Sequence, residues 1–138
     1  MRWRALAIGA FGTLALAASA ADAPSYVVSL ADAVNAYRAA SGLPPLIADA
    51  KLDAIARAHS ATMAQGGKMG HEGFPDRVER SGWPMCVENV GWNFPTARAQ
   101  FDAWRQSPGH DRNLRHPRVE RMGIGVADGY VTFIACGP

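Results

Sequence analysis

The sequence predicts an α+β fold in which helical segments surround a small antiparallel sheet. Apolar residues recur at helical spacing in three separate segments. Two short apolar runs near the C-terminus, 123–127 and 130–134, flank Asp128-Gly129, which is a typical two-residue hairpin turn. A further apolar run at 86–92 supplies another strand. Helices that precede and surround strands in this way favour the α+β class over an alternating parallel fold.

The N-terminal segment has the pattern of a secretory signal peptide rather than that of a membrane helix. Arg2 and Arg4 precede an apolar run, and small residues follow at Ala18-Ser19-Ala20, where a cleavage site belongs. We therefore predict three parts, which are a signal peptide over 1–20, a short N-terminal tail over 21–28 and one domain over 29–138.

Removal of this leader leaves a formally neutral chain. The full sequence has 14 Lys plus Arg and 12 Asp plus Glu, and the leader takes Arg2 and Arg4 with it. A neutral chain lacks the basic footprint of nucleic-acid binding, and no other apolar run approaches the length of a membrane span. We expect an exported protein, periplasmic or extracellular and monomeric, with no nucleic-acid partner and no transmembrane segment in the mature chain.

The two cysteines, Cys86 and Cys136, are expected to form one disulfide, because exported chains fold in an oxidising environment. Such a bond would close a loop of about 51 residues, which the loop-entropy model values at about 4 kcal/mol. Two free buried thiols are the alternative. A bond would tie the strand at 86–92 to the end of the C-terminal hairpin.

The first two helices are bounded by recognisable start and stop signals. The first is expected to begin behind Ser29 and to stop at Gly42. Asp49 is the expected N-cap of the second helix, whose apolar positions share one side until Gly66-Gly67 ends it.

The middle of the chain is the least regular part. Residues 68–85 are rich in glycine, proline and charge, which predicts a loop with at most one helical turn over 76–80. A third long helix begins at Thr96 and runs into the break before Pro108. Three aromatic residues of this region are interpreted as core and loop packing rather than as the mouth of a cleft: Trp83, Trp92 and Phe94.

The turn at the C-terminus fixes the register of the hairpin. A two-residue turn places the residues on either side of it directly opposite each other. We therefore expect Ala127 to face Tyr130, Val126 to face Val131 and Ile124 to face Phe133.

His110 is a candidate functional residue because of its place in a short helix. Ser107 is the expected N-cap and Pro108 the first helical residue, so His110 falls in the first turn. The positive end of the helix disfavours protonation, which leaves a neutral imidazole able to bind a metal or accept a proton. The alternative is a histidine that only holds the short helix in place. Asn113 and Asn89 are expected to give structural support.

Two further residues could join His110 in one cleft. His71 lies beside Gly70 in a loop, where packing does not explain it. Glu88 lies in an apolar run, so its carboxylate must be exposed, paired or functional. The alternatives are a solvated loop histidine and an edge-strand glutamate that faces water or accepts backbone N–H groups. His59, on the apolar stripe of its helix, is interpreted as a core histidine with a satisfied N–H.

Short motifs in a fixed order identify a family resemblance, because the ordered set is specific although each motif alone is weak. The motifs are Asn35-Ala36-Tyr37-Arg38, Gly42-Leu43-Pro44-Pro45-Leu46, Ala58-His59-Ser60, Gly70-His71, Glu88-Asn89-Val90, Ala103-Trp104, Ser107-Pro108-Gly109-His110, Asn113-Leu114 and Met122-Gly123-Ile124-Gly125-Val126. Together they resemble a bacterial CAP domain, of the superfamily of cysteine-rich secretory proteins, antigen 5 and pathogenesis-related proteins. The resemblance covers nearly all of the mature chain.

This resemblance implies a three-layer αβα sandwich with a central cleft. In the family, two histidines and two glutamates typically line that cleft, and some members hold zinc there through the histidines. His71 and His110 match the two histidines, and Glu88 matches the first glutamate. The residues between Trp104 and His110 include no carboxylate, so the second glutamate has no match.

Three functions fit these residues. The favoured one is an exported binding module whose cleft of His71, Glu88 and His110 holds a divalent metal, with Zn²⁺ as the candidate cofactor and the two histidines as its ligands. The family adds a sterol, small lipid or peptide as a possible ligand. The alternatives are a metal-dependent hydrolase with Glu88 as general base, and a disulfide-tied interaction scaffold. No Gly-x-Ser-x-Gly nucleophile elbow is present and the site is one carboxylate short, which favours binding over catalysis.

Overall fold

The structure is a computed structural model that describes residues 23–138, and the predicted signal peptide over 1–20 lies outside the described residues. The elements of the described chain follow the order α1 (Ala23–Ala40), β1 (Ile47–Ala48), α2 (Ala50–Gly66), α3 (Phe74–Ser81), β2 (Met85–Trp92), α4 (Ala97–Gln106), α5 (Pro108–Leu114), β3 (Arg121–Ala127) and β4 (Tyr130–Gly137).

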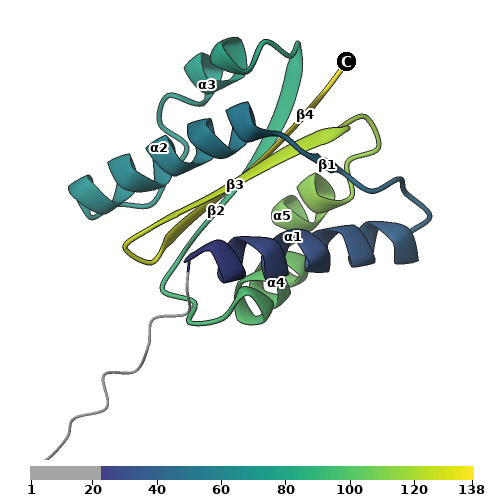
Figure 1. The fold of residues 1–138 in the computed structure, drawn as a ribbon, viewed down its shortest axis with the longest axis horizontal. Coiled ribbons are helices and arrows are strands. Elements are labelled where there is room, and N and C mark those ends of the chain that lie inside the picture. The colour runs from purple at the N-terminus through teal and green to yellow at the C-terminus, as the bar shows by residue number, and fades with distance from the viewer. Residues whose placement is uncertain (1–22) are drawn as a thin grey trace, which may run out of the picture.

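These elements form three layers with the sheet in the middle (Figure 1). Helix α2 packs on β3 and β4, with α3 beside it, while α1, α4 and α5 lie together on the other face. The larger apolar core fills the space between the sheet and α1 and α4, and a smaller one lies under α2. This arrangement confirms the predicted α+β class and the αβα sandwich.

The sheet has the order β1-β3-β4-β2, and its hairpin has the predicted register. Asp128 and Gly129 have φ angles of 47° and 81°, as the tight two-residue turn requires. The sheet is not wholly antiparallel as predicted, because β1 runs parallel to β3. Two residues are too few to show a strand period, which is why the sequence did not reveal β1.

The disulfide between Cys86 and Cys136 is confirmed. The two residues face each other across the antiparallel pair of β2 and β4, with their Cα atoms 4.0 Å apart. The bond therefore joins the edge strand β2 to the centre of the sheet, immediately before the residues that build the site.

Helix α1 begins at Ala23, so the prediction of a tail over 21–28 is wrong for its described part. Tyr26 is only 7% exposed and continues the buried face of Leu30 and Val34. Pro24 lies in the first helical turn, where its missing N–H costs nothing. The helix extends toward the N-terminus because this additional turn buries apolar surface against the core.

The helical turn predicted over 76–80 is longer in the structure, because α3 forms two turns over Phe74–Ser81. Gly73 and Gly82 bound the helix in left-handed conformations, with φ angles of 74° and 77°. These glycines indicated a loop in the sequence, whereas in the structure they are the two caps of a short helix. Helix α3 carries Arg77, whose side chain is buried.

Helix α2 rests directly on the backbone of β3. A Cβ atom on Gly125 would lie 2.1 Å from the backbone nitrogen of Arg57, and one on Gly123 would meet the backbone of the preceding turn equally closely. The Asp53 carboxylate accepts a hydrogen bond of 2.9 Å from the backbone N–H of Ile124. This close approach fixes the position of α2, and with it the side chains of its C-terminal half.

We expect Gly125→Ala to lower the free energy of unfolding by about 2–3 kcal/mol, because the new methyl group overlaps backbone atoms that cannot rotate away. Chemical denaturation measures this change. Gly66→Ala is the matched control, because nothing lies within 4 Å of the added Cβ atom and alanine favours the helix. Wild-type stability in Gly125→Ala would contradict the packing described above.

Candidate functional site

The site is built across β2, which is the edge strand of the sheet. Successive side chains of a strand point to opposite faces, so Glu88 and Val90 share one face and Asn89 lies on the other. Val90 packs with Met63 of α2, whereas the Asn89 side-chain amide donates to the backbone carbonyl of His110 at 3.1 Å. Groups from both helical layers therefore meet at this strand.

Glu88 is buried and paired with an arginine. Only 5% of Glu88 is exposed, and Arg77 of α3 binds its carboxylate with two parallel hydrogen bonds. The Nε atom donates to Oε2 and Nη2 donates to Oε1, both at 2.7 Å. A buried carboxylate requires such compensation, and the bidentate guanidinium is the strongest form of it. Glu88 therefore does not face water. The alternative of an edge-strand glutamate exposed to solvent is wrong.

His71 donates a hydrogen bond to the same carboxylate. Its Nδ1 atom lies 2.8 Å from Oε1 of Glu88. A carboxylate paired with a guanidinium can only accept hydrogen bonds, so the shared proton belongs to Nδ1 of His71. The Nε2 atom then carries the free lone pair, and half of the side chain is exposed to solvent. The predicted proximity of His71 and Glu88 is confirmed.

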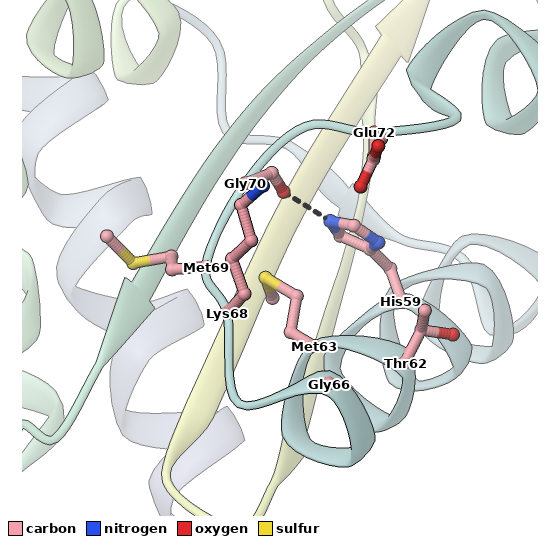
Figure 2. Close-up of a pocket in the computed structure, with 8 residues that line it drawn as sticks. All are labelled: His59, Thr62, Met63, Gly66, Lys68, Met69, Gly70 and Glu72. Carbon is pink, nitrogen blue, oxygen red and sulfur yellow. Dashed lines mark hydrogen bonds between the residues drawn. The ribbon is translucent and has the colours of Figure 1, made fainter.

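The loop that carries His71 is fixed on both sides. The Nε2 atom of His59 donates to the carbonyl oxygen of Gly70 at 2.7 Å, and Nη1 of Arg77 donates to that of Glu72 at 2.7 Å. Figure 2 shows the His59 ring reaching from α2 to the loop. This confirms the interpretation of His59 as a core histidine with a satisfied N–H. Its Nε2 atom also lies 3.8 Å from Oε1 of Glu88, so it belongs to the same cluster.

The two asparagines hold α5 against β2, as predicted. The Asn113 side-chain amide donates to the carbonyl oxygen of Glu88 at 3.1 Å and to Oδ1 of Asn89 at 2.9 Å. Ser107 occupies the predicted N-cap position, but its hydroxyl makes no capping bond. Instead its carbonyl oxygen accepts from the backbone N–H of Asp111 at 2.8 Å. Ser107 supports α5 through its backbone alone.

His110 lies on the opposite side of β2 from the carboxylate of Glu88. Among the described residues, no hydrogen bond or ion pair joins its ring to Glu88. Burial lowers the pKa of His110, and the charge of a protonated His71 lowers it further. Burial is the main cause, and the shift favours the neutral form of the ring.

The carboxylate of Glu88 is engaged by two neighbouring side chains. Both of its oxygens already accept hydrogen bonds from Arg77, and Oε1 also accepts one from His71. Within residues 23–138, no group of three or more His, Cys, Asp or Glu side chains is arranged to hold a metal ion. The groups that remain available for coordination are the rings of His71 and His110.

A small pocket lies behind the loop of His71 (Figure 2). Its volume is about 240 Å³, somewhat below the roughly 300–1,000 Å³ of pockets that take drug-sized ligands. Two methionines supply apolar surface, and charged groups lie on the loop. The lining residues are His59, Thr62, Met63, Gly66, Lys68, Met69, Gly70 and Glu72.

Trp92 differs from its prediction as a packing residue. It is 52% exposed and stacks on Tyr130, with ring centroids 5.8 Å apart. Trp92 is the last residue of the edge strand β2. Trp83, in contrast, packs against the smaller apolar core as predicted.

The chain belongs to the cysteine-rich secretory protein family, whose CAP model matches residues 31–136. The uncharacterized protein YkwD of Bacillus subtilis is 28% identical over 111 residues, which are 75% of this chain and 43% of that protein. The uncharacterized membrane protein YlbC of the same organism is 27% identical over 108 residues, covering 73% of this chain and 31% of that protein. The chain thus spans less than half the length of these relatives.

Solved structures share the fold. An extracellular protein containing an SCP domain from Bacillus anthracis superposes with a TM-score of 0.79 at 24% identity, covering 83% of this chain and 41% of that one. An outer surface protein from Borrelia burgdorferi superposes with a TM-score of 0.76 at 16% identity, covering 84% and 95%. None of the helices between residues 23 and 138 is long and apolar enough to cross a membrane.

We expect the folded domain to lose stability on acidification from pH 7 to pH 5. Burial lowers the pKa of His59 and of His110 in the folded state, so the unfolded chain binds more protons below about pH 6.5 and unfolding becomes easier there. The charged groups around His59 are Arg77, Glu88 and His71.

The variant His59→Gln tests this expectation, because glutamine can still donate to the Gly70 carbonyl but does not titrate. Chemical denaturation at several pH values should give a shallower loss of stability than in the wild-type protein. An unchanged slope would show that His59 does not contribute.

Proposed function

We propose that this domain is an exported binding module whose cleft at the edge of β2 holds a divalent metal ion, zinc in the first place, on His71 and His110. One observation carries the proposal. The Nδ1–H group of His71 donates to the carboxylate of Glu88. Histidines that bind metals typically donate their other ring N–H to a carboxylate in this way, which directs the free nitrogen toward the metal.

The available donors suit zinc. The Nε2 atom of His71 has a free lone pair on a half-exposed side chain, and the lowered pKa of His110 keeps its ring neutral at pH 7. Imidazole nitrogen is a preferred zinc ligand, and two protein ligands leave coordination positions for water or for an atom of a bound molecule. A zinc ion held there would act as a Lewis acid toward an oxygen of that molecule.

The size of the adjoining pocket favours a small peptide group over a lipid as the accompanying ligand. Gly70 and Glu72, the neighbours of His71, line this pocket, so a molecule bound there would lie beside the proposed metal. A volume of about 240 Å³ accommodates a side chain or a short terminus but not a sterol or an acyl chain of full length. Met63 and Met69 offer adaptable apolar contacts for such a group.

Binding is favoured over hydrolysis because Arg77 and His71 already hydrogen-bond to both oxygens of Glu88, so a water molecule would have to compete with them for the carboxylate. Export is supported by the signal-peptide pattern of residues 1–20 and by the disulfide, which is typical of oxidising compartments. The similar structures belong to an extracellular protein and an outer surface protein, which agrees with an exported location.

We expect the wild-type protein to bind zinc at pH 7.5, and both His71→Ala and His110→Ala to abolish detectable binding without unfolding the domain. Isothermal titration calorimetry measures the affinity, and thermal denaturation verifies the fold. Binding should weaken on acidification, because protonation of the His110 ring removes a metal ligand.

His116→Ala is the matched control, because His116 lies after α5 and its Nδ1 atom accepts a hydrogen bond from the backbone N–H of Arg118. It should bind zinc like the wild-type protein. If both cleft variants retain wild-type affinity and lose only stability, the two histidines are structural and the metal proposal fails.

A further inference from the structure

Arg77 makes three side-chain hydrogen bonds, and all of them end on groups next to His71. Two reach the carboxylate of Glu88, which accepts from the His71 ring, and the third reaches the carbonyl oxygen of Glu72, the next residue along the loop. Arg77 is buried, so these bonds are shielded from water and from screening by salt.

We propose that Arg77 is a positioning residue for metal binding, which sets the tautomer and the orientation of His71 through Glu88. This inference rests on the proposed function of His71 as a metal ligand. Arg77 itself touches neither the ion nor the ligand, and no motif that pointed to the cleft included it.

The geometry assigns separate tasks to the three nitrogens of the guanidinium. Nε and Nη2 hold both oxygens of Glu88 at 2.7 Å, so the carboxylate plane cannot rotate. Oε1, held in this plane, lies 2.8 Å from Nδ1 of His71 and accepts a hydrogen bond from its N–H group. Nη1 holds the backbone of Glu72 at 2.7 Å, which fixes the loop from the other side. The planar fork of arginine is required for this, because lysine offers a single point of attachment.

His71 needs the support of Arg77 and Glu88 because little else holds its ring and backbone in place. Half of its side chain is exposed, so packing does not hold the ring in place. Gly70 and Gly73 flank the histidine and its neighbour, and glycine allows the backbone wide conformational freedom. Among the described contacts, the ring makes its hydrogen bond to Glu88 alone, and that carboxylate is oriented by Arg77.

The test compares Arg77→Lys with Arg80→Lys. Lysine at position 77 keeps the positive charge beside Glu88 but loses the fork and cannot reach all three acceptors. Arg80 lies on the same helix and makes only an exposed ion pair of 3.6 Å with Asp76, so Arg80→Lys controls for the substitution itself. Two quantities are measured for each protein: the His71 tautomer by ¹⁵N NMR of the metal-free protein at pH 8, and the zinc affinity by calorimetry.

We expect the wild-type protein and Arg80→Lys to have the Nδ1–H tautomer of His71 alone, and Arg77→Lys to have a mixture of both tautomers. We expect the zinc affinity of Arg77→Lys to fall about ten- to a hundredfold, which is the usual effect of removing a group that orients a metal ligand. A folded Arg77→Lys protein with wild-type tautomer or with wild-type zinc affinity would overturn the proposal.

The two proposals fail in distinguishable ways. If no protein of the series binds zinc, the proposed metal function fails, while the tautomer measurement still decides whether Arg77 positions His71. If Arg77→Lys does not fold, the wild-type spectrum alone decides, because an Nε2–H tautomer of His71 would contradict the assigned geometry and an Nδ1–H tautomer would support it.

Discussion

The buried ion pair between Arg77 and Glu88 is the constraint on which the rest of the site depends. A carboxylate on the helix-covered face of an edge strand cannot remain unpaired, because its desolvation costs several kcal/mol. The pairing with Arg77 ties α3 to β2 and holds the loop between α2 and α3 in a single conformation. The disulfide between Cys86 and Cys136 anchors the same strand two residues before Glu88. The loop that carries His71 is thus held by hydrogen bonds from α2, α3 and β2.

This constraint also fixes the carboxylate itself. Because Arg77 and His71 hydrogen-bond to the two oxygens of Glu88, the carboxylate is held in one orientation. On the other face of the strand, Asn89 donates to the backbone carbonyl of His110, and Asn113 of α5 donates to that of Glu88. Hydrogen bonds therefore hold groups on both faces of β2, which is consistent with the proposed binding function.

Features with a local sequence signal were predictable, and features that depend on tertiary pairing were not. The hairpin register followed from Asp128-Gly129, and the disulfide followed from the two cysteines together with the signal-peptide pattern. The helix α3 was missed because its capping glycines indicate loops, and Arg77 was missed with it, since nothing local marks an arginine as the partner of Glu88. The convergence of His71 and Glu88 was found through the family motifs, whereas the parallel strand β1 has no detectable period.

The most direct test of this account is a double-mutant cycle on Arg77 and Glu88, with the free energy of unfolding measured by chemical denaturation. Each single variant, Arg77→Met or Glu88→Leu, leaves one buried charge without its partner and should cost about 3–5 kcal/mol. The account predicts that the double variant loses far less than the sum of the two, because neither charge remains. Additive losses would show that the two side chains do not depend on each other, and would contradict the organisation of the site around this pair.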